Sequence, residues 1–406
     1  MNWQVIIIVL GCVVNFVYPT YLYDNEKLIR VRKPEEAKGR KYFIDFIGLA
    51  QKFNYTAEQH KVITEDGYIL EIFRIPPSPT FSQQSDKKVV LIQNGFVASS
   101  DTWALMKRSM AYVLADAGYD VWVGNYRGNV YGRSHQTLSP KESLFWNYTW
   151  HEIGALDYAA TIDYILEKTN KSNLTLVGHS MGGTASLVLL SDRPKYNKKI
   201  NLLIALAPGF FWKKTYLLRI LFQKVVCTLK DIVDPEGYSE LLPLSSLPLD
   251  FLNNFCKKNN ILQLCIDALS LFIRAEYNAI NKSDLFTFFN YYPAGISTKT
   301  IAHFCQLSKR RRFALYDYGS KNPEHYGQVD SPEYNWNNIV TKTYIFYSDR
   351  DLIFDGVDAE LLASFMSNNP MIKRVASSSF THLDFIIGID VKALLYDKIS
   401  EIIANN

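Results

Sequence analysis

The chain has 406 residues, of which 48% are hydrophobic and 21% are charged, which is typical of a globular protein with ample length for a large core. Its 44 basic and 40 acidic residues give a formal net charge of +4, so the charge balance does not indicate a nucleic-acid partner. No group of cysteines and histidines has the spacing of a zinc site, and we expect no bound metal.

The first residues differ from the rest of the chain. Residues 5–17 form an apolar run broken only by Gly11 and Asn15. This run is too short to span a bilayer comfortably and is typical of the apolar region of a secretory signal, although a positively charged start is missing. We therefore predict a signal peptide over residues 1–20, export of the chain and no stable transmembrane span. An uncleaved anchor is the alternative interpretation.

Glycosylation sequons and cysteines agree with export. Four sequons are candidates for modification, and they begin at Asn54, Asn147, Asn170 and Asn281. A fifth, at Asn173, directly precedes a predicted strand and is the least suited to carry a glycan. Four cysteines follow the predicted signal: Cys227, Cys256, Cys265 and Cys305. Of these, Cys256 and Cys265 are nine residues apart and could close a small loop in an oxidising compartment.

Helices and strands alternate over the first half of the chain. A helix over residues 44–53 is followed by a hairpin that turns at Asp66–Gly67. Apolar runs then predict strands at 88–93, 120–124, 174–177 and 200–207. Helical spacing predicts helices at 103–117, 153–168 and 184–190. Such alternation indicates a mostly parallel, doubly wound sheet.

The pattern changes from residue 209 to about residue 335, where the chain is helical and apolar with no convincing strand. Predicted helices lie at 216–226, 249–256, 261–273, 283–290 and 298–310. The α/β pattern then resumes with strands at 341–348 and 372–378 and helices at 359–366 and 392–403. We therefore predict one core, made of residues 40–208 and 336–406, with a helical cap over residues 209–335. The cap would lie over the carboxyl ends of the strands, where ligands bind in open α/β folds.

The segment Gly178-His179-Ser180-Met181-Gly182 lies between a predicted strand and a predicted helix. A bare Gly-x-Ser-x-Gly is a weak signal, but a strand, a sharp turn and a helix are the context in which it presents a nucleophilic serine. Glycine is needed at 178 and 182 because side chains there would collide in so tight a turn. We predict Ser180 as the nucleophile of a serine hydrolase.

A serine nucleophile needs a base, which chain order selects. On such a fold the partners follow in the order serine, acid, histidine, each in a loop after a strand. His303 and His325 fall in the predicted cap, whereas His382 follows the last predicted strand and precedes the closing helix. We predict His382 as the general base.

Spacing does not choose the acid or identify a substrate. Asp349, Asp351 and Asp355 all follow the strand predicted at 341–348 and remain alternatives.

Two backbone N–H groups should hold the oxyanion, one from Met181 and one from Phe96 in the loop after residues 88–93.

The chain also resembles a known family over residues 43 to 399. The resemblance rests on segments 64–70 (TEDGYIL), 114–125 (LADAGYDVWVGN), 127–129 (RGN), 145–146 (FW), 290–295 (NYYPAG), 316–319 (YDYG) and 382–385 (HLDF). These segments are similar to those of the acid lipase family of α/β hydrolases, which includes gastric, lysosomal and insect digestive lipases. The resemblance implies an α/β-hydrolase fold whose mostly parallel central sheet carries a helical cap inserted before the acid-bearing strand.

The same resemblance implies a function and assigns further residues. It implies hydrolysis of fatty-acyl esters of neutral lipids, such as triacylglycerols or sterol esters, at an emulsion or lipid-droplet surface, in a secreted or lysosomal protein without a cofactor. Aligned with the family's acid segment, Asp351 is favoured, and Cys256 and Cys265 match the spacing of a family disulfide. Two departures, Asn94 for the usual His and Met181 for the usual Gln, put substrate preference in question. The alternatives are a soluble carboxylesterase and a catalytically silent lipid-binding relative.

Overall fold

The computed structural model describes residues 29–38, 42–77, 87–209 and 280–406. Between the last two ranges it also describes short pieces at 212–213, 216, 219–220, 222–228, 234 and 237–244. The predicted signal peptide, the predicted helices at 249–256 and 261–273, and the predicted disulfide partners Cys256 and Cys265 lie outside the described residues.

A nine-stranded sheet forms the centre of the described chain. Its spatial order is β13 (Met371–Arg374), β12 (Thr343–Tyr347), β9 (Ile200–Leu206), β8 (Leu174–His179), β5 (Val89–Gln93), β6 (Asp120–Val123), β4 (Tyr68–Ile75) and β3 (Glu58–Ile63). The short β7 (Ser134–His135) also pairs with β4. All neighbours from β13 to β6 run parallel, whereas β6, β4 and β3 are antiparallel. The prediction of a mostly parallel sheet is therefore confirmed.

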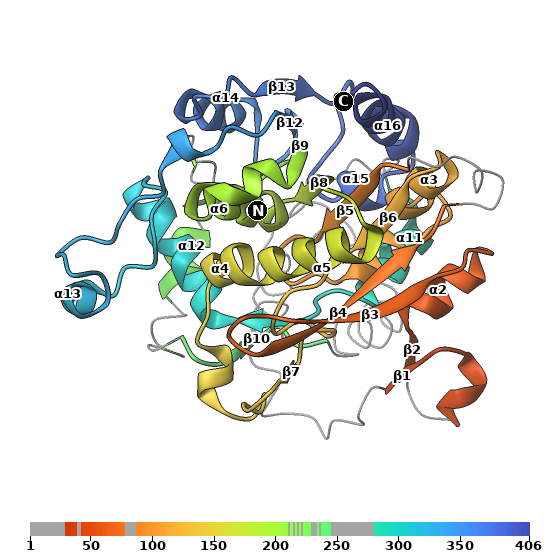
Figure 1. The fold of residues 1–406 in the computed structure, drawn as a ribbon, viewed down its shortest axis with the longest axis horizontal. Helices are drawn as coiled ribbons and strands as arrows, with labels where there is room; N and C mark the ends of the chain where they lie inside the picture. The colour runs from red at the N-terminus through yellow and green to blue at the C-terminus, as the bar shows by residue number, and fades with distance from the viewer. Residues whose placement is uncertain are drawn as a thin grey trace, which may run out of the picture.

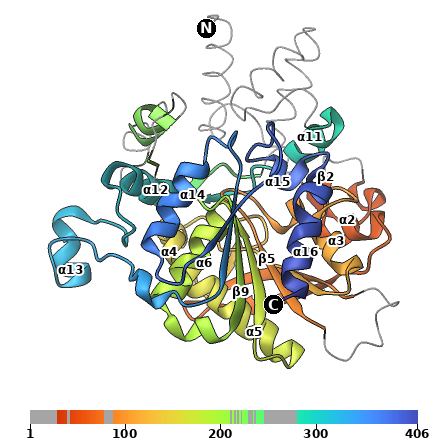
Figure 2. The same cartoon turned by 90° about the horizontal axis from the view of Figure 1, so that it is seen from above.

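Helices cover both faces of this sheet, and Figure 2 shows α4 and α6 on one side and α3 and α16 on the other. Their bounds are α3 (Met110–Asp116), α4 (Trp150–Glu152), α5 (Ala159–Thr169), α6 (Met181–Asp192), α14 (Gly356–Phe365) and α16 (Asp397–Ala404). Because both faces are covered, β5, β6 and β8 are buried along their whole length. The first helix, α2 (Phe46–Lys52), packs at the β3–β4 end of the molecule (Figure 1).

Two predicted helices differ in extent from the observed ones. The helix predicted over 103–117 is shorter, because residues 100–103 form a 3-10 turn and α3 begins only at Met110. The helix predicted over 153–168 begins earlier, at Trp150, where Thr149 and Glu152 form a reciprocal capping box. It then continues through a π-helical turn, Ile153–Tyr158, into α5.

Between β9 and β12 helices are the main regular structure among the described residues. They include α11 (Lys282–Phe289), α12 (Thr298–Arg310) and α13 (Asn322–Tyr326). The expectation that this stretch holds no strand was wrong in one detail. A two-residue antiparallel pair joins β10 (Glu240–Leu241) to β11 (Ile296–Ser297), and so short a pair leaves no alternating pattern in the sequence. Near the N-terminal end, β1 (Ile29–Val31) and β2 (Tyr42–Ile44) form a parallel pair that the sequence reasoning also missed.

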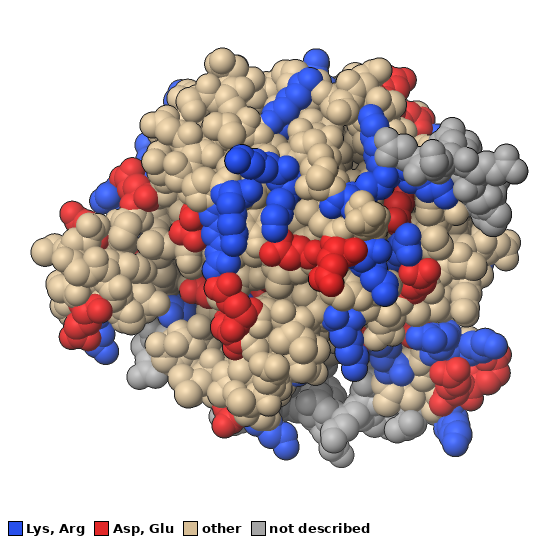
Figure 3. Space-filling model, viewed as in Figure 1, with Lys and Arg blue, Asp and Glu red and all other residues tan. Residues whose placement is uncertain are grey.

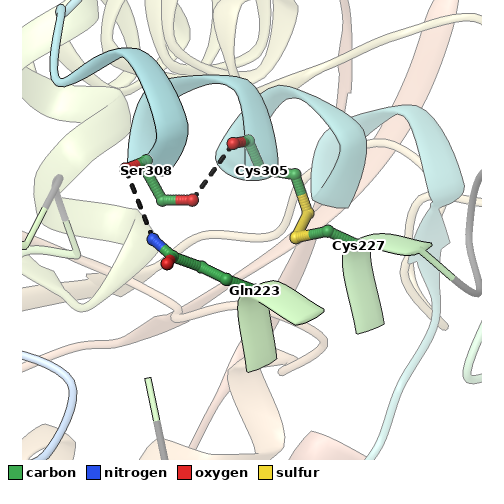
Figure 4. The surroundings of a disulfide bond; sticks show 4 residues. All are labelled: Gln223, Cys227, Cys305 and Ser308. Atoms are coloured by element: carbon green, nitrogen blue, oxygen red, sulfur yellow. Dashed lines mark hydrogen bonds between the residues drawn. A yellow bond between two sulfur atoms is a disulfide. The ribbon is translucent and has the colours of Figure 1, made fainter. Parts of the chain in front are cut away.

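A disulfide joins Cys227 to Cys305 across 78 residues (Figure 4). It links the segment after β9 to the middle of α12. Beside it, Gln223 Nε2 donates to the Ser308 carbonyl at 3.3 Å, and Ser308 Oγ donates to the Cys305 carbonyl at 3.0 Å. The disulfide lies in a small apolar cluster with Ile301, against which the side chain of Phe96 packs. No sequence signal selected this pair.

Removing this cross-link should lower stability, because it closes a long loop in the unfolded chain. We expect the double variant Cys227→Ala/Cys305→Ala to lose about 2–4 kcal/mol of unfolding free energy, measured by denaturant titration. Reduced wild-type protein serves as the control, and its unfolding free energy should approach that of the double variant. Equal stability of the oxidised wild type and the variant would contradict the prediction.

Candidate functional site

The turn from β8 into α6 has the geometry that a nucleophilic serine requires. Ser180 has φ 53° and ψ −124°, a conformation that costs a non-glycine residue energy and is characteristic of functional sites. A Cβ on Gly178 would lie 2.6 Å from the backbone of Gly182. A Cβ on Gly182 would lie 2.7 Å from the carbonyl oxygen of Asn94. Both glycines are therefore required, the second because the turn packs against the end of β5.

The structure separates the three acid candidates. Asp349 is exposed and pairs with Arg374 at 2.6 Å. Asp355 accepts from the amides of residues 357 and 358 and caps α14. Asp351 is buried, and its Oδ2 lies 2.7 Å from His382 Nδ1. Of the three, Asp351 alone contacts the predicted base, and Asp351 is also the residue that the resemblance favours.

The loop that carries His382 is held on both sides of the histidine. The hydroxyl of Ser348, at the end of β12, donates to the Phe380 carbonyl. Across His382, Asp384 Oδ2 accepts from Thr381 N at 2.6 Å and from Thr381 Oγ1 at 2.5 Å. Burial raises the pKa of Asp384 to about 6, against the opposing effect of these bonds. Among the described residues Ser180 Oγ forms no hydrogen bond with His382. Such bonds often tighten only when substrate binds.

A second histidine, His179, was not predicted from the sequence and lies against the predicted base, His382. The ring of His179 is buried, and its centroid is 4.7 Å from that of His382. It also contacts Phe385 at 5.7 Å and Trp103 at 6.0 Å. Burial, and then the proximity of His382, hold the pKa of His179 well below its usual range. The neighbour of the predicted base is therefore a neutral ring.

The two predicted oxyanion donors lie at loops that border Ser180. A Cβ on Gly95, the residue before Phe96, would lie 3.1 Å from Ser180 Cβ and 3.3 Å from His179 Nδ1. A Cβ on Gly209 would lie 3.9 Å from Ser180 Oγ and 4.0 Å from Met181 N. Within the described part of the chain, the amides of Phe96 and Met181 donate to no backbone carbonyl outside a helix or strand. The amide of Met181 opens α6, where helix N–H groups lack partners.

The loop after Phe96 holds a buried carboxyl group. Asp101 is 1% exposed and accepts from Tyr131 OH at 2.7 Å and from Ser99 Oγ at 3.2 Å. Burial raises its pKa from an ordinary 3.8 to about 7, and the positive charge of Arg30 and the bonds from Tyr131 and Ser99 offset only part of that rise. This carboxyl group therefore titrates near neutral pH.

Metal ligands, apolar helices, surface charge and glycan sites indicate which partners and modifications the described residues could accept. No group of His, Cys, Asp and Glu residues among the described positions could hold a metal ion, and no described helix is long and apolar enough to cross a bilayer. Basic and acidic side chains are mixed on the face drawn in Figure 3. The four candidate glycan sites, Asn54, Asn147, Asn170 and Asn281, are all exposed. The Oδ1 atom of Asn147 also accepts from the buried Lys299 Nζ at 2.6 Å.

Comparison with known families identifies the class of protein. Residues 88–388 match the family described as the alpha/beta hydrolase fold. Residues 46–107 match the family described as a partial alpha/beta-hydrolase lipase region. The chain therefore belongs to the α/β hydrolases.

Individual relatives narrow the family further. The chain is 35% identical to Lipase 1 of Drosophila melanogaster over 87% of its own length and 78% of that protein. It is 33% identical to human Lipase member J (87% and 97% covered) and 32% identical to gastric triacylglycerol lipase of Bos taurus (92% and 93%). The chain thus belongs to the lipase family of α/β hydrolases, which are carboxylic ester hydrolases. A soluble variant of monoglyceride lipase from Saccharomyces cerevisiae shares the fold at TM-score 0.54 and 13% identity, covering 87% and 97% of the two chains.

The contact between Asp351 and His382 predicts that Asp351→Asn and Asp349→Asn differ strongly in their effect on kcat. Asp351→Asn should lower kcat on an ester substrate on the order of ten-thousandfold, because an amide cannot stabilise an imidazolium in the required orientation. Asp349→Asn is the matched control and should retain wild-type kcat, since Asp349 pairs with Arg374 at the surface. The reverse pattern of activities would move the acid to Asp349.

The raised pKa of Asp101 predicts a pH-dependent effect on stability. In the folded chain Asp101 holds its proton up to about pH 7, whereas the unfolded chain releases it near pH 3.8. The stability that it contributes is therefore fully present below about pH 3.8 and is lost progressively between pH 3.8 and about pH 7, at about 1.4 kcal/mol per pH unit.

Asn mimics the protonated carboxyl group, so Asp101→Asn should gain stability relative to wild type, by a few kcal/mol, between pH 5 and pH 8. Denaturant titrations at the two pH values measure this gain. Asp390→Asn, at an exposed position, is the control. A pH-independent difference between Asp101→Asn and wild type would contradict the prediction.

Proposed function

We propose that the chain hydrolyses fatty-acyl esters with Ser180 as nucleophile, His382 as general base and Asp351 as the acid that orients the histidine. The observation that carries this proposal is the 2.7 Å bond between His382 Nδ1 and buried Asp351, at the sheet edge where Ser180 lies in its strained turn. Binding at Nδ1 fixes the tautomer and leaves Nε2 to accept the serine proton.

The reaction would proceed through an acyl-enzyme. Ser180 Oγ attacks the ester carbonyl carbon while His382 takes the hydroxyl proton, and the carbonyl oxygen becomes an oxyanion held by the amides of Phe96 and Met181. Collapse of this intermediate breaks the bond to the alcohol, which leaves with the proton from His382. A water molecule activated by His382 then attacks the acyl-enzyme and releases the fatty acid and free Ser180. No cofactor takes part in these steps.

Neutral lipids, such as triacylglycerols or sterol esters, are the substrates that we propose. Support comes from relatives at 32–35% identity that carry the names lipase and gastric triacylglycerol lipase. We further propose that residues 209–335 form the cap, that the enzyme acts at an emulsion or lipid-droplet surface, and that it is secreted or lysosomal after removal of residues 1–20. A disulfide between Cys256 and Cys265 and glycans on the exposed sequons belong to the same proposal.

Active-site labelling tests the nucleophile, and a substrate panel tests the substrate class. A fluorophosphonate should label the wild-type protein and leave Ser180→Ala unlabelled, because labelling requires an activated serine hydroxyl. Unlabelled wild-type protein would contradict the hydrolase proposal, and labelled Ser180→Ala would contradict the assignment of the nucleophile.

Fatty-acid release should be faster from emulsified triolein or cholesteryl oleate than from a dissolved short-chain ester. Activity confined to the dissolved ester would identify a soluble carboxylesterase instead.

A further inference from the structure

The carboxyl group of Asp351 is held on both oxygens. Its Oδ2 contacts His382, and its Oδ1 accepts from two consecutive backbone amides, those of Ile353 at 2.7 Å and Phe354 at 3.1 Å. The aim of Oδ2 at the histidine therefore depends on the orientation of the two peptide groups that hold Oδ1.

Each of these two peptide groups is held at its other end by a side chain from the segment after β9. The peptide that donates its N–H from Ile353 has its carbonyl on Leu352, and that carbonyl accepts from Arg219 Nε at 2.7 Å. The next peptide donates its N–H from Phe354, and its carbonyl, on Ile353, accepts from Trp212 Nε1 at 2.9 Å. The peptide unit is planar with its N–H and C=O pointing in opposite directions, so fixing the carbonyl fixes the direction of the N–H.

The two side chains are themselves firmly placed. Arg219 is 1% exposed and Trp212 is 4% exposed, and the guanidinium carbon of Arg219 lies 5.4 Å from the ring centroid of Trp212. Arg219 Nη2 also bonds to Asp358 Oδ2 at 2.6 Å in α14. A buried, charge-assisted donor on a carbonyl polarises the peptide and strengthens its N–H as a donor.

We infer that Trp212 and Arg219 are positioning residues for the catalytic acid. Through two peptide groups they set the orientation of the Asp351 carboxyl group, and thereby that of His382. This inference rests on the proposed function of Ser180, His382 and Asp351. By this inference the segment after β9 affects the rate of the chemical step, in addition to forming part of the proposed cap.

The same segment provides a matched control. Tyr216 OH donates to Asp355 Oδ2 at 2.6 Å, so it bonds to the same loop but to the residue that caps α14 and not to a peptide that holds Asp351. Trp212→Phe removes one hydrogen-bond donor together with the five-membered ring of the indole, and Tyr216→Phe removes one donor with its hydroxyl group. Trp212→Phe should therefore cost more stability than Tyr216→Phe, so the melting temperature is measured for both, and the two differ in whether the lost bond leads to the acid.

The experiment compares wild type, Trp212→Phe, Tyr216→Phe and Arg219→Lys, the last of which keeps the buried charge beside Asp358. For each, kcat and KM are measured on a dissolved p-nitrophenyl ester, together with the rate of fluorophosphonate labelling and the melting temperature. Trp212→Phe and Arg219→Lys should lower both kcat and the labelling rate by roughly five- to tenfold with KM unchanged, as for a weakened hydrogen bond that acts on the chemical step.

Tyr216→Phe should keep the wild-type kcat and labelling rate. The inference is overturned if Trp212→Phe reacts as fast as wild type, or if kcat falls in both Phe variants in proportion to their loss of melting temperature. Absence of labelling in the wild type would instead overturn the proposed function, so the two failures are distinguishable.

Discussion

The parallel arrangement of the strands from β5 to β13 is the constraint on which the candidate site depends. Parallel strands end at the same edge of a sheet, so the loops that carry Ser180, Asp351 and His382 meet there although about 200 residues of chain separate the first from the last. Bonds between neighbouring loops complete the arrangement. The amide of Ser180 donates to the Leu206 carbonyl at 2.8 Å, and the hydroxyl of Ser348 donates to the Phe380 carbonyl.

The features that the sequence predicts well are those encoded locally. Five of the six parallel strands, all except β13, are predicted from apolar runs within one or two residues of their observed bounds. Chain order alone was enough to choose His382, because only one histidine follows the last predicted strand. The choice of Asp351 over Asp349 and Asp355 rests on different grounds. Local spacing left all three open, and the resemblance to a family supplied the preference.

The features that the sequence did not predict all depend on contacts between distant segments. The Cys227–Cys305 disulfide spans 78 residues, and four cysteines allow several pairings that spacing cannot rank. The ring contact between His179 and His382 requires the adjacency of two loops, and His179 by itself is only the variable residue of a short motif. The bonds from Trp212 and Arg219 end on backbone carbonyls, which every residue possesses, so no residue type in the loop after β12 marks the contact.

The surroundings of His382 suit the proposed role of this residue as a base that would carry a transient positive charge. His179 is a neutral ring because burial opposes its protonation, so it adds no positive charge beside the imidazolium that the proposed reaction would form. Asp384 lies on the same loop with a pKa raised to about 6, so in mild acid it becomes a neutral hydrogen-bonding group. Among the described residues, the carboxyl group that bonds to His382 is that of Asp351. In the proposed reaction the orientation of Asp351 would affect the rate, and that orientation depends on the peptide groups that hold its second oxygen.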